Sequence, residues 1–511
     1  MHVNRFVAPV TAALLLVPPL TAQDRAATDA LARTRAQQAA AALGGEAALR
    51  TISRVSLHGI SVLYQREQSE RPEGPWLPTF SEFTDLRDVG ADTVWRTART
   101  RGFVTEDDTD WSAESSVTVA DGLAFRATDA GLTPALTPWD LGALPADLGP
   151  EHVVIAALDA RDLHIEGDIQ LHGSPHHVVA FTHRGARVRL ILGASSLMPK
   201  AVEITHARPF DTYWAPWGDV TQRVTFAAWL IEPEGIRFPR VWEYSTDGVV
   251  DGTVDLTRVR LTVAQPSKDA DGSGAALRAA IAARRRVAEL PLGDTRRRPA
   301  ELAPGIVKIP ASFDIVEVKQ DDGVVIIEAP LTSAYSQKVI EDAAKRFPGT
   351  PIKALVTTSD SWPHIGGVRE FVARGIPAYA LDLNVPILGR LVAATYQSEP
   401  DTLARVPQQP VWRVVSSRTM LGSGPNRIEL LPLRTVSGER QMMVYFPALR
   451  LLYTSDLFTI RDNLVFLPQM VGEAVVAAGR DHLDPTRAFG MHYDALPWQT
   501  VVDSAKPKAY R

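Results

Sequence analysis

The first half of the chain is patterned as short runs of alternating apolar and polar residues. Between residues 52 and 263 these runs are broken by Gly, Pro and Asp, and over residues 258–263 the alternation is strict. A strand with one buried and one solvated face requires this alternation. The pattern therefore predicts an antiparallel β domain. A helix is expected before it, over residues 24–43, because that stretch is rich in helix formers and ends at Gly44-Gly45.

After Pro304 strands and helices alternate along the chain, which is typical of a layered α/β domain. The predicted strands are 306–309, 313–318, 324–327, 353–356 and 378–381, and the predicted helices are 333–346 and 367–374. The expected domains are a helix with an antiparallel β domain at 23–265, a linker at 266–300 that contains a helix over 275–290, and an α/β domain at 301–511.

Residues 1–22 have the features of a cleavable secretory signal. His2 and Arg5 precede a short apolar run, and small residues follow it up to Ala22. A membrane anchor is the weaker alternative, because prolines interrupt the run and it falls short of the roughly 20 residues that span a bilayer. We therefore expect cleavage near Ala22, a periplasmic or secreted protein, and no membrane span in the mature chain.

The amino-acid composition excludes several classes of function and several kinds of site. The 511 residues are 45% hydrophobic and 22% charged, which excludes disorder throughout, and the net charge of −5 gives no basic field for nucleic acid. The chain has no cysteine, so a thiol nucleophile, a disulfide and a thiolate metal site are all excluded. Any metal ion must be held by His, Asp or Glu.

Two polar or aromatic features have two interpretations each. The arginine clusters 284–286 and 296–298 form either an anion patch or, as we favour, a solvated face of the linker. The loop 209–219, with Trp214 and Trp217, either lines a ligand cavity or, as we favour, caps a sheet edge. The histidines at 176, 177 and 482 are interpreted as structural.

The segment from Thr358 to Gly367 reads Thr-Ser-Asp-Ser-Trp-Pro-His-Ile-Gly-Gly and follows an apolar strand. It resembles the metal-binding loop of the metallo-β-lactamase superfamily, whose pattern is Thr-His-x-His-x-Asp-His-x-Gly-Gly. His364 matches the last histidine of that pattern. Ser359 and Ser361 stand at the two earlier histidine positions, and Pro363 stands at the aspartate position.

The resemblance extends over residues 300–511. Asp456, at the end of a strand pair, resembles the aspartate that bridges two metal ions in the family, and His492 in Gly490-Met491-His492 resembles the last metal histidine. Residues 434–440, where a further histidine ligand would stand, contain none. The resemblance implies a four-layer αββα domain, so the fold class combines α+β and α/β architecture.

The resemblance also implies a reduced metal site. The first site of the family is lost, whereas His364, Asp456 and His492 remain to hold one divalent ion, with zinc as the expected metal. Asp360 is a candidate fourth oxygen ligand, and Asp360 and Asp456 are the candidate catalytic residues. The implied reaction is water-mediated hydrolysis of an ester, an amide or a phosphoester. The alternative is a protein without metal or catalysis that acts as an envelope binding or scaffold protein.

The β domain resembles, in general layout, the half-open barrels of periplasmic lipoprotein carriers and sorting factors. This resemblance implies a curved sheet that shelters a small-molecule or apolar envelope ligand. The sequence of neither domain indicates an oligomeric state.

Overall fold

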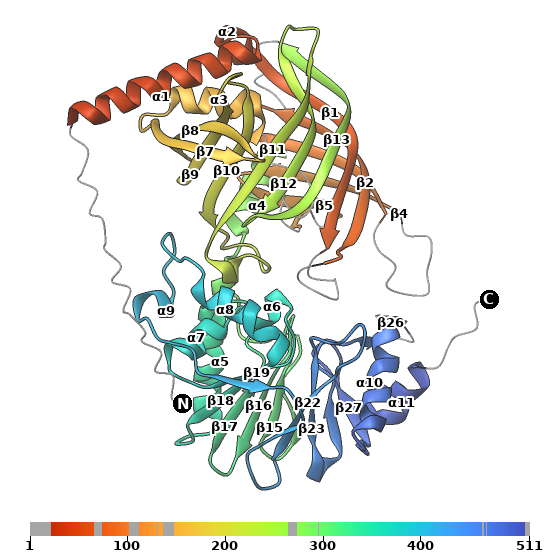
Figure 1. Cartoon of the computed structure of the whole chain (residues 1–511). Helices are drawn as coiled ribbons and strands as arrows, with labels where there is room; N and C mark the ends of the chain where they lie inside the picture. The colour runs from red at the N-terminus through yellow and green to blue at the C-terminus, as the bar shows by residue number, and fades with distance from the viewer. Residues whose placement is uncertain are drawn as a thin grey trace, which may run out of the picture.

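The computed structural model describes residues 22–65, 74–101, 112–129, 131–135, 148–263, 273–294, 296–461, 464–466 and 468–505. These residues form a β body and an αββα body, drawn at the top and the bottom of Figure 1. Residues 1–21 lie outside the described residues, so signal cleavage near Ala22 stays a prediction. No helix among the described residues is both long enough and apolar enough to cross a membrane.

The β body is built on one sheet of 13 strands in the order β6-β5-β4-β3-β2-β1-β13-β12-β11-β10-β9-β8-β7. Its pairs are antiparallel, as the alternating pattern predicted. The strands are β1 (Ile52–Gln65), β2 (Leu77–Asp88), β3 (Thr93–Arg101), β4 (Ser112–Ala120), β5 (Leu123–Thr128), β6 (Gly131–Pro134), β7 (His164–Leu171), β8 (Ser174–His183), β9 (Ala186–Gly193), β10 (Pro199–Ala207), β11 (Asp219–Ile231), β12 (Arg237–Thr246) and β13 (Val249–Val263).

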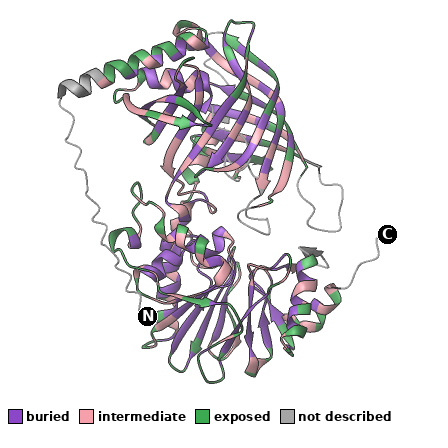
Figure 2. Cartoon of the chain, viewed as in Figure 1, coloured by how far each residue is buried: buried purple, intermediate pink, exposed green. Residues whose placement is uncertain are grey.

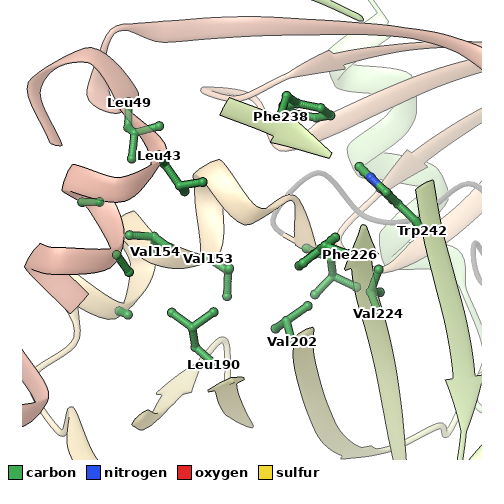
Figure 3. Packing of buried hydrophobic residues seen from close by; sticks show 14 of the residues in the cluster. Leu43, Leu49, Val153, Val154, Leu190, Val202, Val224, Phe226, Phe238 and Trp242 are labelled. Carbon is green, nitrogen blue, oxygen red and sulfur yellow. The ribbon is translucent and has the colours of Figure 1, made fainter. Parts of the chain in front are cut away.

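Helices α1 (Ala22–Leu43), α2 (Glu46–Arg50) and α3 (Pro150–Asp159) pack against one face of this sheet. On α1 the buried residues Ala32, Ala36, Ala39 and Ala40 recur at helical spacing, and their small side chains let the helix approach closely. Figure 3 shows apolar side chains of these helices facing those of the strands. The helix predicted over 24–43 is confirmed.

The predicted linker helix over 275–290 is shorter than expected. It runs as α4 (Ser273–Ala283) and is followed by the 3-10 turn η4 (Val287–Glu289). The backbone at Arg286 is extended, and the Val287 amide donates to the Pro209 carbonyl. Val287 is 3% exposed and belongs to the core of the αββα body. The helix ends before Val287 because burial of this side chain stabilises the fold more than another helical turn would.

The αββα body contains two mixed sheets and a small hairpin. The first sheet is β14 (Ala300–Ala303), β15 (Ile306–Ile309), β16 (Ile315–Gln320), β17 (Gly323–Ile327), β18 (Ile352–Thr357), β19 (Ala378–Leu381) and β20 (Trp412–Val415). The second is β21 (Thr419–Leu421), β22 (Ile428–Pro432), β23 (Met442–Phe446), β24 (Leu451–Tyr453), β27 (Arg487–Phe489) and β28 (Leu496–Pro497), and the hairpin is β25 (Thr459–Arg461) with β26 (Leu464–Phe466).

Three apolar cores arrange these sheets into four layers. One core lies between the two sheets, a second joins the first sheet to α5 (Ser333–Arg346), α7 (Val368–Ala373) and α8 (Val385–Ala393), and a third joins the second sheet to α10 (Pro468–Arg480) and α11 (Trp498–Ser504). Figure 2 shows the strands of both sheets largely buried between the helices. The described residues therefore have the αββα layering that the sequence predicted. Short helices α6 (Trp362–Ile365) and α9 (Thr402–Arg405) add Trp362, Ile365 and Leu403 to the core that joins the first sheet to its helices.

The loop 209–219 connects the paired strands β10 and β11, so it does not cap a free sheet edge as we favoured. Instead it packs against the αββα body. Trp214 and Val220 belong to the apolar core of the αββα body, although they lie in the part of the sequence that forms the β body. The two bodies therefore share apolar core contacts at this loop.

Candidate metal centre

Three segments that are distant in sequence end at one edge of the αββα body. His364 lies on α6, which follows β18, while Asp456 follows β24 and His492 follows β27. Strands β24 and β27 are parallel neighbours, so their carboxyl ends lie side by side. Loops at the carboxyl ends of strands are where layered α/β folds place functional side chains.

The structure brings the three predicted ligands together. One ligand atom each from His364, Asp456 and His492 lies within 4.8 Å of the others, and within the described ranges no other group of three such residues does so. His492 Nε2 is 2.8 Å from Asp456 Oδ1, and His364 Nδ1 is 3.5 Å from Asp456 Oδ2. Two imidazoles and one carboxylate form a donor set suited to a zinc-like divalent ion.

The surroundings set the protonation of this group. His364 is only 2% exposed, and the ring of Phe313 covers it with a centroid distance of 4.7 Å. Burial lowers the pKa of His364 to about 4, although the Asp456 carboxylate opposes that shift. Burial raises the pKa of Asp456, but His364 and His492 together outweigh it, so the net shift is downward. A neutral imidazole and an ionised carboxylate are the forms that bind metal.

Asp360 is not part of this group. Its Oδ2 atom lies 3.8 Å from Arg440 Nε, at the side of the loop. The metal group found among the described residues contains His364, Asp456 and His492 alone. The roles of Asp360 as fourth ligand and catalytic residue therefore stay predictions.

Hydrogen-bonding side chains occupy the space next to Ser359, beside the predicted ligand His364. The Thr358 hydroxyl donates to Glu328 and lies 2.6 Å from Ser455 Oγ, and the Tyr453 hydroxyl donates to Glu328 Oε1 at 3.3 Å. Ser359 Oγ is 3.3 Å from His364 Nδ1. Burial raises the pKa of Glu328 to about 8. This network contributes hydroxyl and protonated carboxyl groups, which are poor metal ligands.

Sequence reasoning missed Glu328. The available signal was a glutamate directly after the apolar run Val324–Ile327, at the carboxyl end of a buried strand. A charged side chain at the end of such a run is rarely buried without a partner.

A buried lysine, also missed, holds the loops that carry His492 and Phe313. Lys308 is 1% exposed, and its Nζ atom lies 2.7 Å from Asp314 Oδ2 and 2.8 Å from Asp494 Oδ1. It also donates to the Tyr493 carbonyl at 2.8 Å. These three contacts tie the segment around Phe313 to the segment around His492. The signal was the polar position of Lys308 in an otherwise apolar strand.

A cleft of about 960 Å³ opens beside His492. Its wall includes Arg296 and Arg297. The Arg296 side chain is 89% exposed, so this part of the second arginine cluster is solvated, as we favoured, while it borders the cleft. Asp294 and Asp494 line the same cleft. Asp294 pairs with both guanidinium groups, whereas Asp494 pairs with Lys308. The cleft therefore gives a mixed, polar approach to the metal group.

The three histidines that were interpreted as structural make local polar contacts or lie in a turn. His176 Nδ1 is 2.8 Å from the Ser174 carbonyl, and His177 pairs with Asp168 at 2.7 Å. His482 has a positive φ of 53° in the turn after α10. None of the three belongs to the metal group found among the described residues.

No protein-family model matches the chain, and no curated protein matches it. Solved structures similar to it include a stereoselective inverting sec-alkylsulfatase from a Pseudomonas species, with 16% identity over 42% of this chain and 41% of that one and a TM-score of 0.32. The chain thus spans less than half of that protein. Metallo-β-lactamases from Hirschia baltica (15% identity, 41% of this chain and 98% of that one, TM-score 0.31) and Pontibacter korlensis (12%, 40% and 96%, 0.32) are also similar. In these three matches the similarity covers 40–42% of the chain.

Proposed function

We propose that the chain is a hydrolase that holds one divalent metal ion, zinc by its donor set, on His364, Asp456 and His492. The observation that supports this proposal is the convergence of their ligand atoms within 4.8 Å from three separate segments. A chance cluster of exposed acids would look different, because His364 is buried and Phe313 contacts both imidazoles, at centroid distances of 4.7 and 5.9 Å. The residues present therefore fit a metal ion.

A metal ion held there would supply Lewis acidity and lower the pKa of water at the centre. The chain's own groups supply orientation and access. Phe313 shields the imidazoles from bulk solvent, Asp456 contributes the single negative charge of the group, and Lys308 fixes the loops on either side. The cleft beside His492 admits a polar substrate, so an ester, an amide or a phosphoester is the substrate class.

The capacity for one ion follows from the neighbouring network. Ser359 and Ser361 stand where imidazoles would be needed, and beside them Thr358 is hydrogen-bonded to both Glu328 and Ser455. Since neutral hydroxyls bind zinc weakly, a second ion lacks ligands. Hydrolysis would then proceed without the clamp that a pair of ions provides.

The alternative is a binding or scaffold protein that has lost catalysis. The specific observation in its favour is that His364 Nδ1 already has Ser359 Oγ at 3.3 Å and Asp456 Oδ2 at 3.5 Å. Such a group is held together by its own polar contacts and needs no ion to satisfy His364.

Hydrolysis assays on the full chain separate the two candidates. The substrates are p-nitrophenyl acetate and bis-p-nitrophenyl phosphate, tested after chelation and again after zinc is restored. We expect activity that is lost on chelation and returns with zinc, and that is absent in His492→Ala but retained in His482→Ala. Equal turnover in His492→Ala and wild type, or no turnover in any sample, contradicts the hydrolase and favours the scaffold.

We also propose export, on the evidence of residues 1–22 alone. N-terminal sequencing of the protein recovered outside the cytoplasm should begin near Gln23. Full-length protein found only in the cytoplasm would contradict export.

A further inference from the structure

The loop 209–219 of the β body reaches the helix that carries His364. Trp214 and Trp217 both pack on Trp362, the first residue of α6, with ring centroids 4.8 and 5.6 Å away. Trp214 is 5% exposed and Trp362 is 8% exposed. In Figure 1 this loop is the yellow-green segment that meets the αββα body near α6 and α8. His364 is therefore two residues from an aromatic contact between the bodies.

Helix α6 has little stability of its own. It contains four residues, and a single helical turn in isolation is unfavourable because nucleation costs more than one hydrogen bond returns. Its place must come from what packs on it. On one side the Leu331 amide donates to the Pro363 carbonyl at 2.7 Å. On the other side stand Trp214 and Trp217.

The end of α6 is held as tightly as its start. A methyl group added at Gly366 would lie 2.1 Å from the Leu331 carbonyl oxygen and 2.7 Å from Pro216 Cβ. The backbone just after His364 is therefore clamped between Leu331 of its own body and Pro216 of the loop. Only glycine allows this approach.

The loop is itself anchored, so it is able to act as a fixed wall. The Asp219 amide donates to the Thr395 carbonyl at 2.7 Å, and the Asp219 carboxylate accepts from the amide of Gln397 at 2.6 Å. The Tyr396 hydroxyl donates to the Pro216 carbonyl. A Cβ at Gly218 would lie 2.2 Å from the Thr395 carbonyl oxygen. The loop and residues 395–397 form one interlocked unit.

We infer that Trp217 and the loop 209–219 are a positioning element for His364, so that the β body completes the candidate metal centre of the αββα body. The inference rests on the proposed function for its consequence, because outer-shell groups that orient a metal ligand typically change metal affinity by about 10- to 100-fold. The packing of α6 supports the positioning role of the loop, and this role is testable without metal.

The test uses the full-length, metal-free protein and the acylation of histidines by diethyl pyrocarbonate, followed by mass spectrometry. Exposed His482 is the internal reference, and His364, at 2% exposure, should be protected in the wild type. In Trp217→Ala His364 should become reactive relative to His482, and Trp217→Phe should restore protection. The matched control is Trp229→Ala, a half-buried tryptophan of the same body whose ring packs on Phe226 at 6.1 Å, and it should leave His364 protected.

Zinc affinity, measured by titration on the same variants, supplies the second readout. We expect a loss of about tenfold or more in Trp217→Ala and recovery in Trp217→Phe. If Trp217→Ala does not fold, Trp217→Leu replaces it, because leucine keeps an apolar side chain in the interface. Continued protection of His364 in a folded Trp217→Ala or Trp217→Leu overturns the inference. Absence of zinc binding in the wild type overturns the proposed function instead, and the acylation result still decides the inference.

Discussion

His492 Nε2 lies 2.8 Å from Asp456 Oδ1, and this contact joins the loops that follow two parallel strands. The other oxygen of the same carboxylate faces His364 at 3.5 Å. Asp456 is thus the residue that links the two imidazoles, and it brings the only negative charge to the group identified among the described residues.

Asp456→Asn should uncouple zinc from the stability of the fold. A ligand that binds only the folded state raises stability by about 2.7 kcal/mol when its concentration is 100 times its dissociation constant. The melting temperature of the wild type should therefore rise when zinc is added and fall when it is chelated. Differential scanning fluorimetry should show neither shift in Asp456→Asn, with His482→Ala as the control that keeps both.

Lys308→Met should weaken metal binding without touching a ligand. The substitution removes the ammonium that holds Asp314 and Asp494 and leaves Asp314, which is 1% exposed, without that partner. We expect a loss of zinc affinity of about tenfold, together with a lower melting temperature. Lys353→Met, which removes a lysine paired with Asp322 elsewhere in the body, is the control. Equal zinc affinity in both variants would show that the buried lysine does not support His492.

Glu328→Gln should change how stability depends on pH. Burial raises the folded-state pKa of Glu328 to about 8, whereas the pKa of an unfolded glutamate is about 4.3. The stabilising contribution is fully present below the lower value and is lost as pH rises toward the higher one, because only the unfolded chain releases its proton in that interval. Urea unfolding should be measured at several pH values from 5 to about 8. Over this range the free energy of unfolding should decline less steeply for Glu328→Gln than for the wild type. Parallel curves would place the ionisable group elsewhere.

Asp85→Ala should destabilise the β body strongly. Asp85 is 1% exposed and lies 3.7 Å from both Arg87 Nη2 and Arg96 Nε, which are each 2% exposed. Removing one partner of a buried ion pair costs about 3–5 kcal/mol, since it leaves uncompensated charge. Asp159→Ala, which breaks an exposed pair with Arg50, should cost no more than about 1 kcal/mol. Chemical denaturation followed by circular dichroism measures both, and similar midpoints for the two variants would refute the buried pairing.

The sequence predicted the elements whose patterns are local. Strict alternation over residues 258–263 reflects one face against the core and one against solvent, so β13 and the antiparallel sheet could be anticipated. Helix α3 was not anticipated, because its ten residues are apolar enough to resemble a buried strand and only Pro150 marks its start. The predicted linker helix ended early because Val287 is buried by tertiary contacts.

The candidate ligands could be found from sequence because the short segments around His364, Asp456 and His492 resemble metal-binding segments of the metallo-β-lactamase superfamily in the same order along the chain. Their partners could not. Trp217 and Trp362 are far apart in sequence, and nothing local to either indicates that they pack together. Lys308 and Glu328 gain their roles only through burial against other segments, which no single run of residues encodes.

Zinc content per chain, measured by inductively coupled plasma mass spectrometry on protein purified without chelator, shows directly whether His364, Asp456 and His492 hold a metal ion. We predict about one ion in the wild type, none in His492→Ala, and about one in Asp360→Ala, because Asp360 lies beside Arg440 outside the group. Iron and manganese are measured in the same samples. Two ions per wild-type chain, or an equal metal content in His492→Ala and wild type, would contradict a single metal centre on His364, Asp456 and His492.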